Sequence, residues 1–92
     1  MSQIENIAIE FQNFAHTCMH NYAAAIKQKY SRNNINSEER LQVFNENLDS
    51  LKAALQVKMQ LLIKQAEEKN QLRKQLADIY ETVVNEFYRK EF

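Results

Sequence analysis

The sequence contains no glycine and no proline in 92 residues, although average usage would place about eleven of them in a chain of this length. Glycine supplies the positive φ angles of tight hairpin turns and phosphate-binding loops, and proline ends helices. Their absence argues against β-hairpins, nucleotide-cradling loops, nucleophile elbows and dinucleotide-binding fingerprints. The chain is therefore predicted to be all-α, with long helices and few breaks.

An excess of charge of either sign is also missing, because twelve basic and twelve acidic side chains cancel to a formal net charge of 0. Binding to nucleic acid by counterion release needs a basic face, so we expect no nucleic-acid partner. Small basic groups do occur in residues 27–32 and 64–74. We interpret both as solvated helical faces; the second contains Lys64, Lys69, Arg73 and Lys74 against Glu67 and Glu68.

Cysteine and long apolar runs are scarce as well. Cys18 is the single cysteine, which excludes an intramolecular disulfide and favours a reducing compartment, where a buried thiol is expected. No apolar run approaches the roughly 20 residues that span a bilayer, so no membrane partner is expected. The first ten residues lack the basic and apolar regions of a signal peptide. We expect a cytoplasmic protein, with export by a route that needs no cleaved signal as the alternative.

Residues 3–30 carry the apolar pattern of a helix, with steps of three and four residues. The Asn- and Ser-rich segment 31–37 is the predicted turn, because asparagine tolerates the left-handed conformation and both side chains compete for backbone hydrogen bonds. Ser37 is the expected N-cap of the next helix and Asn36 is the alternative. The stripe on the first helix comprises Ile4, Ile7, Phe11, Phe14, Cys18, Tyr22, Ala25 and Ile26, with Ile9, Met19 and Ala23 beside or behind it.

A second helix is predicted from 38 to 90, because one heptad-like phase continues from Leu41 to Val83. A break near 67–70 is the alternative, with Asn70 as the only turn-forming residue in that polar stretch. The phase is carried by Leu41, Phe44, Leu48, Leu51, Leu55, Leu62, Leu72, Leu76, Ile79 and Val83, with Lys58, Gln65 and Lys69 at core-like positions that we expect to set register.

Helix lengths decide what must cover the apolar stripe near the C-terminus. This C-terminal stripe comprises Leu76, Ile79, Tyr80, Val83, Val84, Phe87 and Tyr88. A first helix of about 28 residues spans roughly 42 Å, whereas a helix from 38 to 90 would span about 80 Å. Either another chain covers the excess, as in an antiparallel helical hairpin that dimerises with coiled-coil-like packing, or the chain bends into a three-helix bundle. Residues 53–63 are apolar on most of their circumference and need more than one neighbour. The predicted partner or oligomer interface is Val57, Leu61, Leu72, Leu76, Ile79, Tyr80, Val83 and Phe87.

The sequence offers no catalytic constellation. His16 and His20 have the spacing of a metal-ligand pair on one helix face, but no third ligand completes it, so we interpret them as surface histidines. The Glu-x-x-His pairs of di-iron helical bundles are absent. We expect no enzyme activity, cofactor, metal or small-molecule substrate.

The expected function is a non-enzymatic protein–protein interaction module: an adaptor, chaperone or inhibitor of a larger complex. It would act through apolar helix faces and bind a second copy, as a homodimer, or a different protein. The first alternative is a self-contained three-helix bundle of the immunity-protein or inhibitor type, which recognises its partner through an exposed polar face. The second is a regulator that gains a basic, nucleic-acid-binding face on dimerisation.

Overall fold

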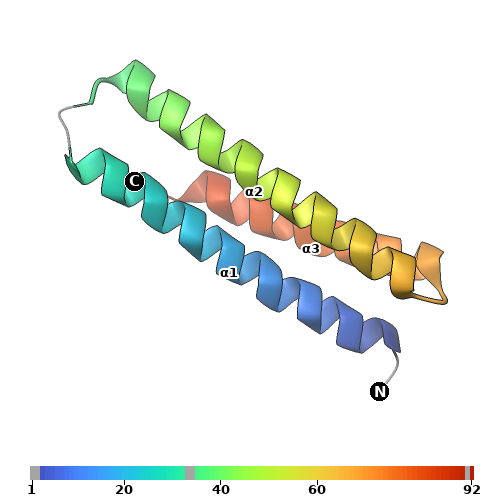
Figure 1. The fold of residues 1–92 in the computed structure, drawn as a ribbon. Coiled ribbons are helices and arrows are strands. Elements are labelled where there is room, and N and C mark those ends of the chain that lie inside the picture. Colours follow the sequence, from blue (N-terminus) through green and yellow to red (C-terminus); the bar gives the residue numbers. More distant parts are fainter. Residues whose placement is uncertain (1–2, 33–34, 91) are drawn as a thin grey trace.

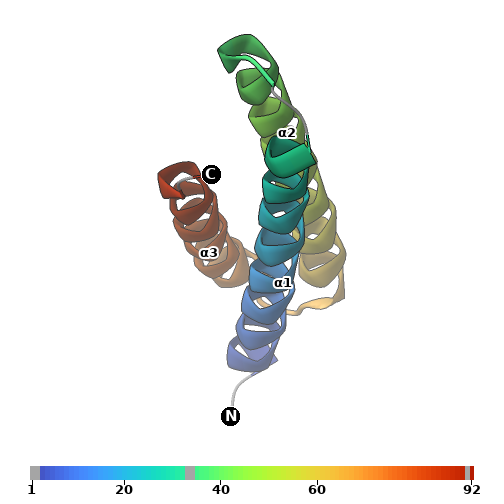
Figure 2. The same ribbon diagram turned by 90° about the vertical axis from the view of Figure 1, so that its left-hand side faces the viewer.

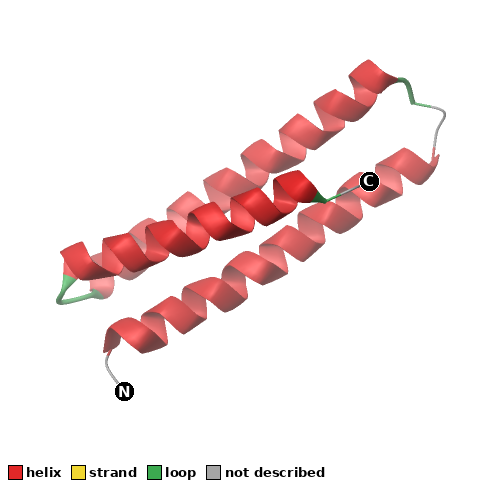
Figure 3. Cartoon of the chain, turned by 180° about the vertical axis from the view of Figure 1, so that it is seen from behind, coloured by secondary structure: helices red, strands yellow, loops and turns green. Residues whose placement is uncertain are grey.

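The computed structural model describes residues 3–32, 35–90 and 92, and these form three helices with no strand. The helices are α1 (Gln3–Arg32), α2 (Ser37–Gln65) and α3 (Lys69–Arg89). α2 runs antiparallel to α1, and α3 returns parallel to α1 (Figure 1). Each helix packs against the other two, which makes a bundle of 51 × 18 × 18 Å. Figures 2 and 3 show α3 lying along both partners rather than extending beyond them.

The all-α prediction is confirmed, and of the two arrangements left open the structure has the three-helix bundle. A continuous helix from 38 to 90 is wrong, because the chain leaves helical geometry at 66–68. The break precedes the predicted position by one or two residues, and Asn70 lies inside the first turn of α3.

The connection between α2 and α3 forms without glycine because its residues keep negative φ angles. Ala66, at the end of α2, has φ −91° and ψ 151°, and Glu68, before α3, has φ −97° and ψ 76°. No positive φ occurs among the described residues. Ala66 is extended, and backbone angles with negative φ are open to any L-residue, so a chain without glycine can reverse direction here. Of the three asparagines in the predicted turn 31–37, Asn36 has φ −79° and so is not left-handed, whereas Asn33 and Asn34 lie outside the described residues.

Asn36, rather than Ser37, caps the start of α2. Its backbone is extended, and the Glu39 N–H donates a hydrogen bond of 2.8 Å to the Asn36 side-chain oxygen Oδ1. This is the bond by which an N-cap satisfies a free N–H of the first helical turn. Glu38 and Glu39 then lie in that turn, where the helix dipole favours negative charge.

The core runs along the bundle axis. The buried side of α1 differs from the predicted stripe, because α1 packs against both α2 and α3. Met19 and Ala23, predicted beside or behind the stripe, are buried, whereas Ile7, Phe14, Cys18 and Tyr22 are partly buried at its edge. The buried set is Ile4, Phe11, Ala15, Met19, Ala23, Ile26, Leu48, Leu51, Leu55, Leu62, Ala66, Leu72, Leu76, Val83, Val84 and Phe87.

Burial of α3 explains why the chain breaks rather than continuing as one helix. Leu72, Leu76, Val83 and Phe87 are almost fully buried against the other two helices. Fully burying an aliphatic or aromatic side chain stabilises by roughly 1.5 to 3 kcal/mol, so these four contribute about 6 to 12 kcal/mol. Interrupting a helix forfeits about four backbone hydrogen bonds, each with a net contribution of roughly 1 kcal/mol. Burial therefore outweighs the break.

An aromatic cluster lies at the end of the bundle that is farther from the 66–68 break. The rings of Phe44 in α2 and Phe87 in α3 stack with centroids 5.4 Å apart, and Phe92 lies 6.2 Å from Tyr30 in an edge-to-face arrangement. The Tyr30 hydroxyl also donates a hydrogen bond of 2.8 Å to the Arg40 carbonyl. These contacts join all three helices at the end where α1 turns into α2.

Leu41 is not part of the core, although the periodicity predicts it to be. Its side chain is 61% exposed. Phe44, one turn further into α2, already contacts Phe87 and Tyr88 near the end of α3. With 21 residues against 29 in α2, α3 ends before it reaches the level of Leu41.

Because α3 belongs to the core of the monomer, the pair Leu76→Asp with Val83→Asp is expected to unfold the chain. Removing a buried leucine side chain costs roughly 2 to 5 kcal/mol, and a carboxylate in its place adds a desolvation penalty. Whole domains are stabilised by only about 5 to 15 kcal/mol. Circular dichroism and thermal melting measure the result.

The matched control is Leu41→Asp with Leu61→Asp, which places the same two carboxylates at exposed leucines. This pair should shift the stability by less than about 1 kcal/mol. A core variant that stays as helical and as stable as the control would contradict the fold described above.

Candidate functional site

The predicted interface residues separate into two groups. Leu72, Leu76, Val83 and Phe87 are buried inside the chain's own bundle, and Ile79 and Tyr80 are partly buried against the same core. The core thus supplies a cover for these six residues without a second chain. Val57 and Leu61, both on α2, are the two that remain exposed, and the interface prediction stays open for them.

Val57 and Leu61 face outward because α2 has apolar side chains on three sides and only two neighbouring helices. Leu55 and Leu62 fill the bundle core, and Met59 and Ile63 pack partly against it. Val57 follows Leu55 by two residues, or about 200° around the helix, and so points away from the core. Its side chain is 58% exposed and that of Leu61 is 53% exposed.

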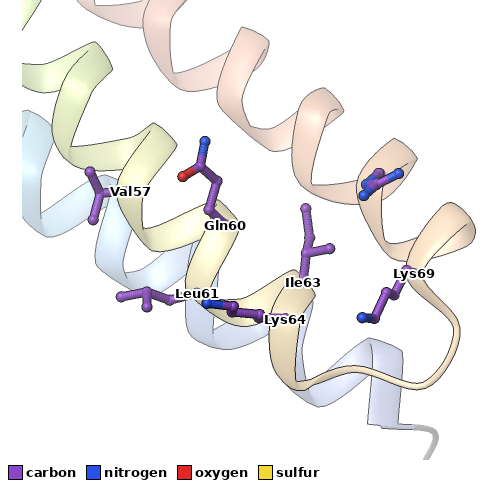
Figure 4. A pocket seen from close by; sticks show the side chains of 7 residues that line it. Val57, Gln60, Leu61, Ile63, Lys64 and Lys69 are labelled. Carbon is purple, nitrogen blue, oxygen red and sulfur yellow. The ribbon is translucent and has the colours of Figure 1, made fainter.

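These two residues form one end of an open pocket of about 530 Å³ between the second half of α2 and the first two turns of α3. Figure 4 shows Val57 and Leu61 along α2, Ile63 and Lys64 nearer the connection, and Lys69 across from them on α3. The volume lies in the range of ligand-binding pockets, which is roughly 300 to 1,000 Å³. The lining is Val57, Gln60, Leu61, Ile63, Lys64, Lys69 and Arg73.

The charged residues of the pocket are all cationic. Lys64, Lys69 and Arg73 line it, and no carboxylate of the described residues does. Glu67 and Glu68, which separate these cations in the sequence, lie instead beside Gln3 and Ile4 at the start of α1. The break at 66–68 thus places basic and acidic side chains on different sides of one connection. Among the described residues, no ion pair is recorded for the three cations.

The sequence pattern predicts a solvated face for these cations, an apolar side of the helix for Ile63 and no role for Gln60. The sequence does contain a signal for the pocket: Lys64, Lys69 and Arg73 lie close to the possible break near 67–70. Side chains on either side of a reversal come together in space, whereas on a continuous helix they would be spread along the axis.

Of the three polar residues predicted at core-like positions, one lies between two helices. Lys58 is partly buried, with its ammonium nitrogen 3.2 Å from a Glu10 carboxylate oxygen and 5.4 Å from the centre of the Phe14 ring. These contacts tie α2 to one register against α1, although an ion pair this exposed contributes at most about 1 kcal/mol. Gln65 and Lys69 are exposed at the ends of their helices, so they do not set register within the core.

Two further places expose large apolar side chains. Ile9 on α1 is 51% exposed, without another large apolar residue exposed beside it on that helix. Leu41 and Tyr88, which is 57% exposed, flank the aromatic cluster around Phe44. A single exposed apolar residue such as Ile9 is normal on a soluble protein. Val57 and Leu61 differ in that they also line the pocket of about 530 Å³.

A second, smaller pocket lies on the other side of α3, between α1 and α3. His16 and Asp78 both line this pocket of about 170 Å³, but no hydrogen bond joins their side chains there. The described part of the chain holds no group of three or more His, Cys, Asp or Glu side chains placed to bind a metal ion. None of its helices combines the length and the apolar character needed to cross a membrane.

Comparisons of the chain with protein-family models, with curated proteins and with solved structures gave no match.

Cys18 is a partly buried free thiol at the edge of the core, and burial raises its pKa above that of an ordinary cysteine. The thiolate is the reactive form, and a raised pKa lowers its fraction at any given pH. Alkylation of Cys18 by iodoacetamide at pH 8 is therefore expected to be slower in the folded protein than in urea. The midpoint of its rate–pH profile should move upward on folding, and a midpoint below that of the unfolded chain would contradict the burial.

Proposed function

We propose that this chain is a non-enzymatic protein–protein interaction module, built as a self-contained three-helix bundle that docks a partner protein on the outer face of α2. The observation that carries the proposal is the exposure of Val57 and Leu61 beside an open pocket, in a bundle that buries its other apolar stripes. The broad classes that fit such a surface are adaptors, chaperones and inhibitors of a larger assembly.

The closed core favours a partner that adds to a finished monomer over one that completes an unfinished core. The C-terminal stripe, which gave the sequence argument for a dimer, is packed against α1 and α2. A second copy remains an alternative occupant, because a pair of copies could cover Val57 and Leu61 as readily as a different protein could.

The size of the site argues for an interface that extends along the bundle. A stable complex usually buries about 800 Å² on each partner. The whole bundle exposes 6422 Å², so such an interface would take roughly an eighth of it. The pocket would then supply the buried centre where most of the binding energy is concentrated, with the polar sides of α2 and α3 as its rim.

The test is site-specific photo-crosslinking with benzoylphenylalanine in place of Leu61 in one sample and Asn13 in another. Both positions are exposed on helices, so neither replacement should disturb the core. In native lysate, the reagent at residue 61 is expected to give one dominant protein adduct, and the reagent at residue 13 only weak, diffuse labelling. Adding Val57→Asp to the Leu61 sample should remove the adduct.

The purified protein crosslinked alone separates the two kinds of partner. An adduct of twice the 10.9 kDa chain mass would identify a second copy as the occupant. Equal labelling from residues 61 and 13, or an adduct that persists with Val57→Asp, would contradict docking on this face of α2.

A further inference from the structure

We propose that the pocket between α2 and α3 binds an acidic amphipathic helix of the partner protein. Its carboxylates would lie against Lys64, Lys69 and Arg73, and its apolar side chains against Val57 and Leu61. The inference rests on the proposed function and adds the chemistry of the partner. Charge complementarity carries it, because the lining contains three cations and no anion in a chain whose net charge is zero.

The arrangement of these cations is a product of the fold. Lys64 is in the last turn of α2, and Lys69 and Arg73 belong to the first two turns of α3. The nearest acidic residues in the sequence, Glu67 and Glu68, line a separate pocket at the start of α1, and among the described residues neither forms an ion pair with these cations. Bringing three like charges together without a counter-charge is unfavourable. A ligand that supplies carboxylates relieves that repulsion.

The apolar part of the lining has the dimensions of a helix contact. Val57, Leu61 and Lys64 follow one another at i, i+4 and i+7, which covers about 10 Å of the axis of α2. A partner helix docked alongside would meet this row with its own residues at the same spacing. Because the apolar residues precede the cations along α2, the partner needs leucine-like side chains toward one end and carboxylates toward the other.

Nucleic acid is the weaker occupant of the same surface. Phosphate backbones would use the cations but leave Val57, Leu61 and Ile63 facing a charged, hydrated chain. Duplex binders usually neutralise six or more phosphates, and three cations on a neutral chain fall short of that. A helix with both apolar and acidic side chains uses the whole lining.

The experiment is an NMR titration of the ¹⁵N-labelled full chain with a capped 14-residue helical peptide. The peptide carries leucines at three- and four-residue spacing and a cluster of glutamates at one end. Two matched peptides replace every glutamate by glutamine or by lysine. The acidic peptide is expected to shift the amide signals of Val57, Leu61, Lys64, Lys69 and Arg73, with an affinity at least about tenfold above that of the glutamine peptide.

Protein variants test whether the three cations act as proposed. Lys64→Gln, Lys69→Gln and Arg73→Gln together are expected to abolish the tenfold preference for the acidic peptide. The matched control is Lys27→Gln, Lys29→Gln and Arg89→Gln, which removes the same charge from exposed sites outside the pocket and should leave the preference intact. Raising the salt from 0.1 to 1 M should weaken binding of the acidic peptide, because the Debye length falls from about 10 to 3 Å.

The outcomes separate this inference from the proposed function. Equal binding of the acidic, neutral and basic peptides at the pocket would overturn the acidic partner but retain docking on α2. Absence of shifts with all three peptides at millimolar concentration, together with no adduct from residue 61, would overturn both. Tight binding of duplex DNA at low salt, lost in the Lys64, Lys69 and Arg73 variant, would replace the acidic helix by a nucleic acid.

Discussion

The reversal at residues 66–68 decides how this chain closes its core. Ala66 leaves helical geometry in an extended conformation, yet its side chain is buried, so the reversal is packed against the bundle. The Leu72 N–H donates to the Glu68 carbonyl at 3.2 Å and so begins α3 directly after the break. From there the apolar face of α3 returns along α1 and α2 (Figure 3). Without this reversal, four large apolar side chains of α3 would have no intrachain cover.

The same reversal creates the surface through which we propose that the protein acts. Once α1 and α3 occupy two sides of α2, the third apolar side has no helix left to cover it. Val57 and Leu61 lie on that side, and the reversal brings Lys69 and Arg73 of α3 next to Lys64 of α2. A single structural event therefore completes the core and leaves an apolar, basic pocket at its edge. Proteins commonly depart from an optimally covered surface at functional sites.

Much of the fold could be predicted from the sequence, because the relevant signals are local. The absence of glycine and proline and the three- and four-residue apolar steps were enough for helices with a turn in 31–37. The break at 66–68 was harder to predict, because a heptad-like spacing of apolar residues does not show whether the chain continues or reverses direction. Its phase passes from Leu62 through Gln65 and Lys69 to Leu72 as though the helix continued. Only tertiary burial of α3 decides against that, and tertiary burial regularly overrides local propensity.

The candidate site was predictable only in part, for the same reason. Val57 and Leu61 stood out because α2 had more apolar sides than one partner helix could cover. The basic rim depended on the reversal and could not be placed before the break was. Leu41 was predicted to be buried from its position in the heptad-like pattern, but it is exposed because α3 is too short to reach it. Periodicity indicates which side of a helix is apolar, whereas helix length and direction decide what covers it.

Small-angle X-ray scattering of the purified chain, on a sizing column and across a range of concentrations, measures whether α3 folds back along α1 and α2 of its own chain. A self-closed bundle predicts a radius of gyration close to the 15.3 Å of the Cα atoms for the 10.9 kDa monomer. A monomer with the much larger radius of a helix of about 80 Å would mean that α3 does not close the core of its own chain.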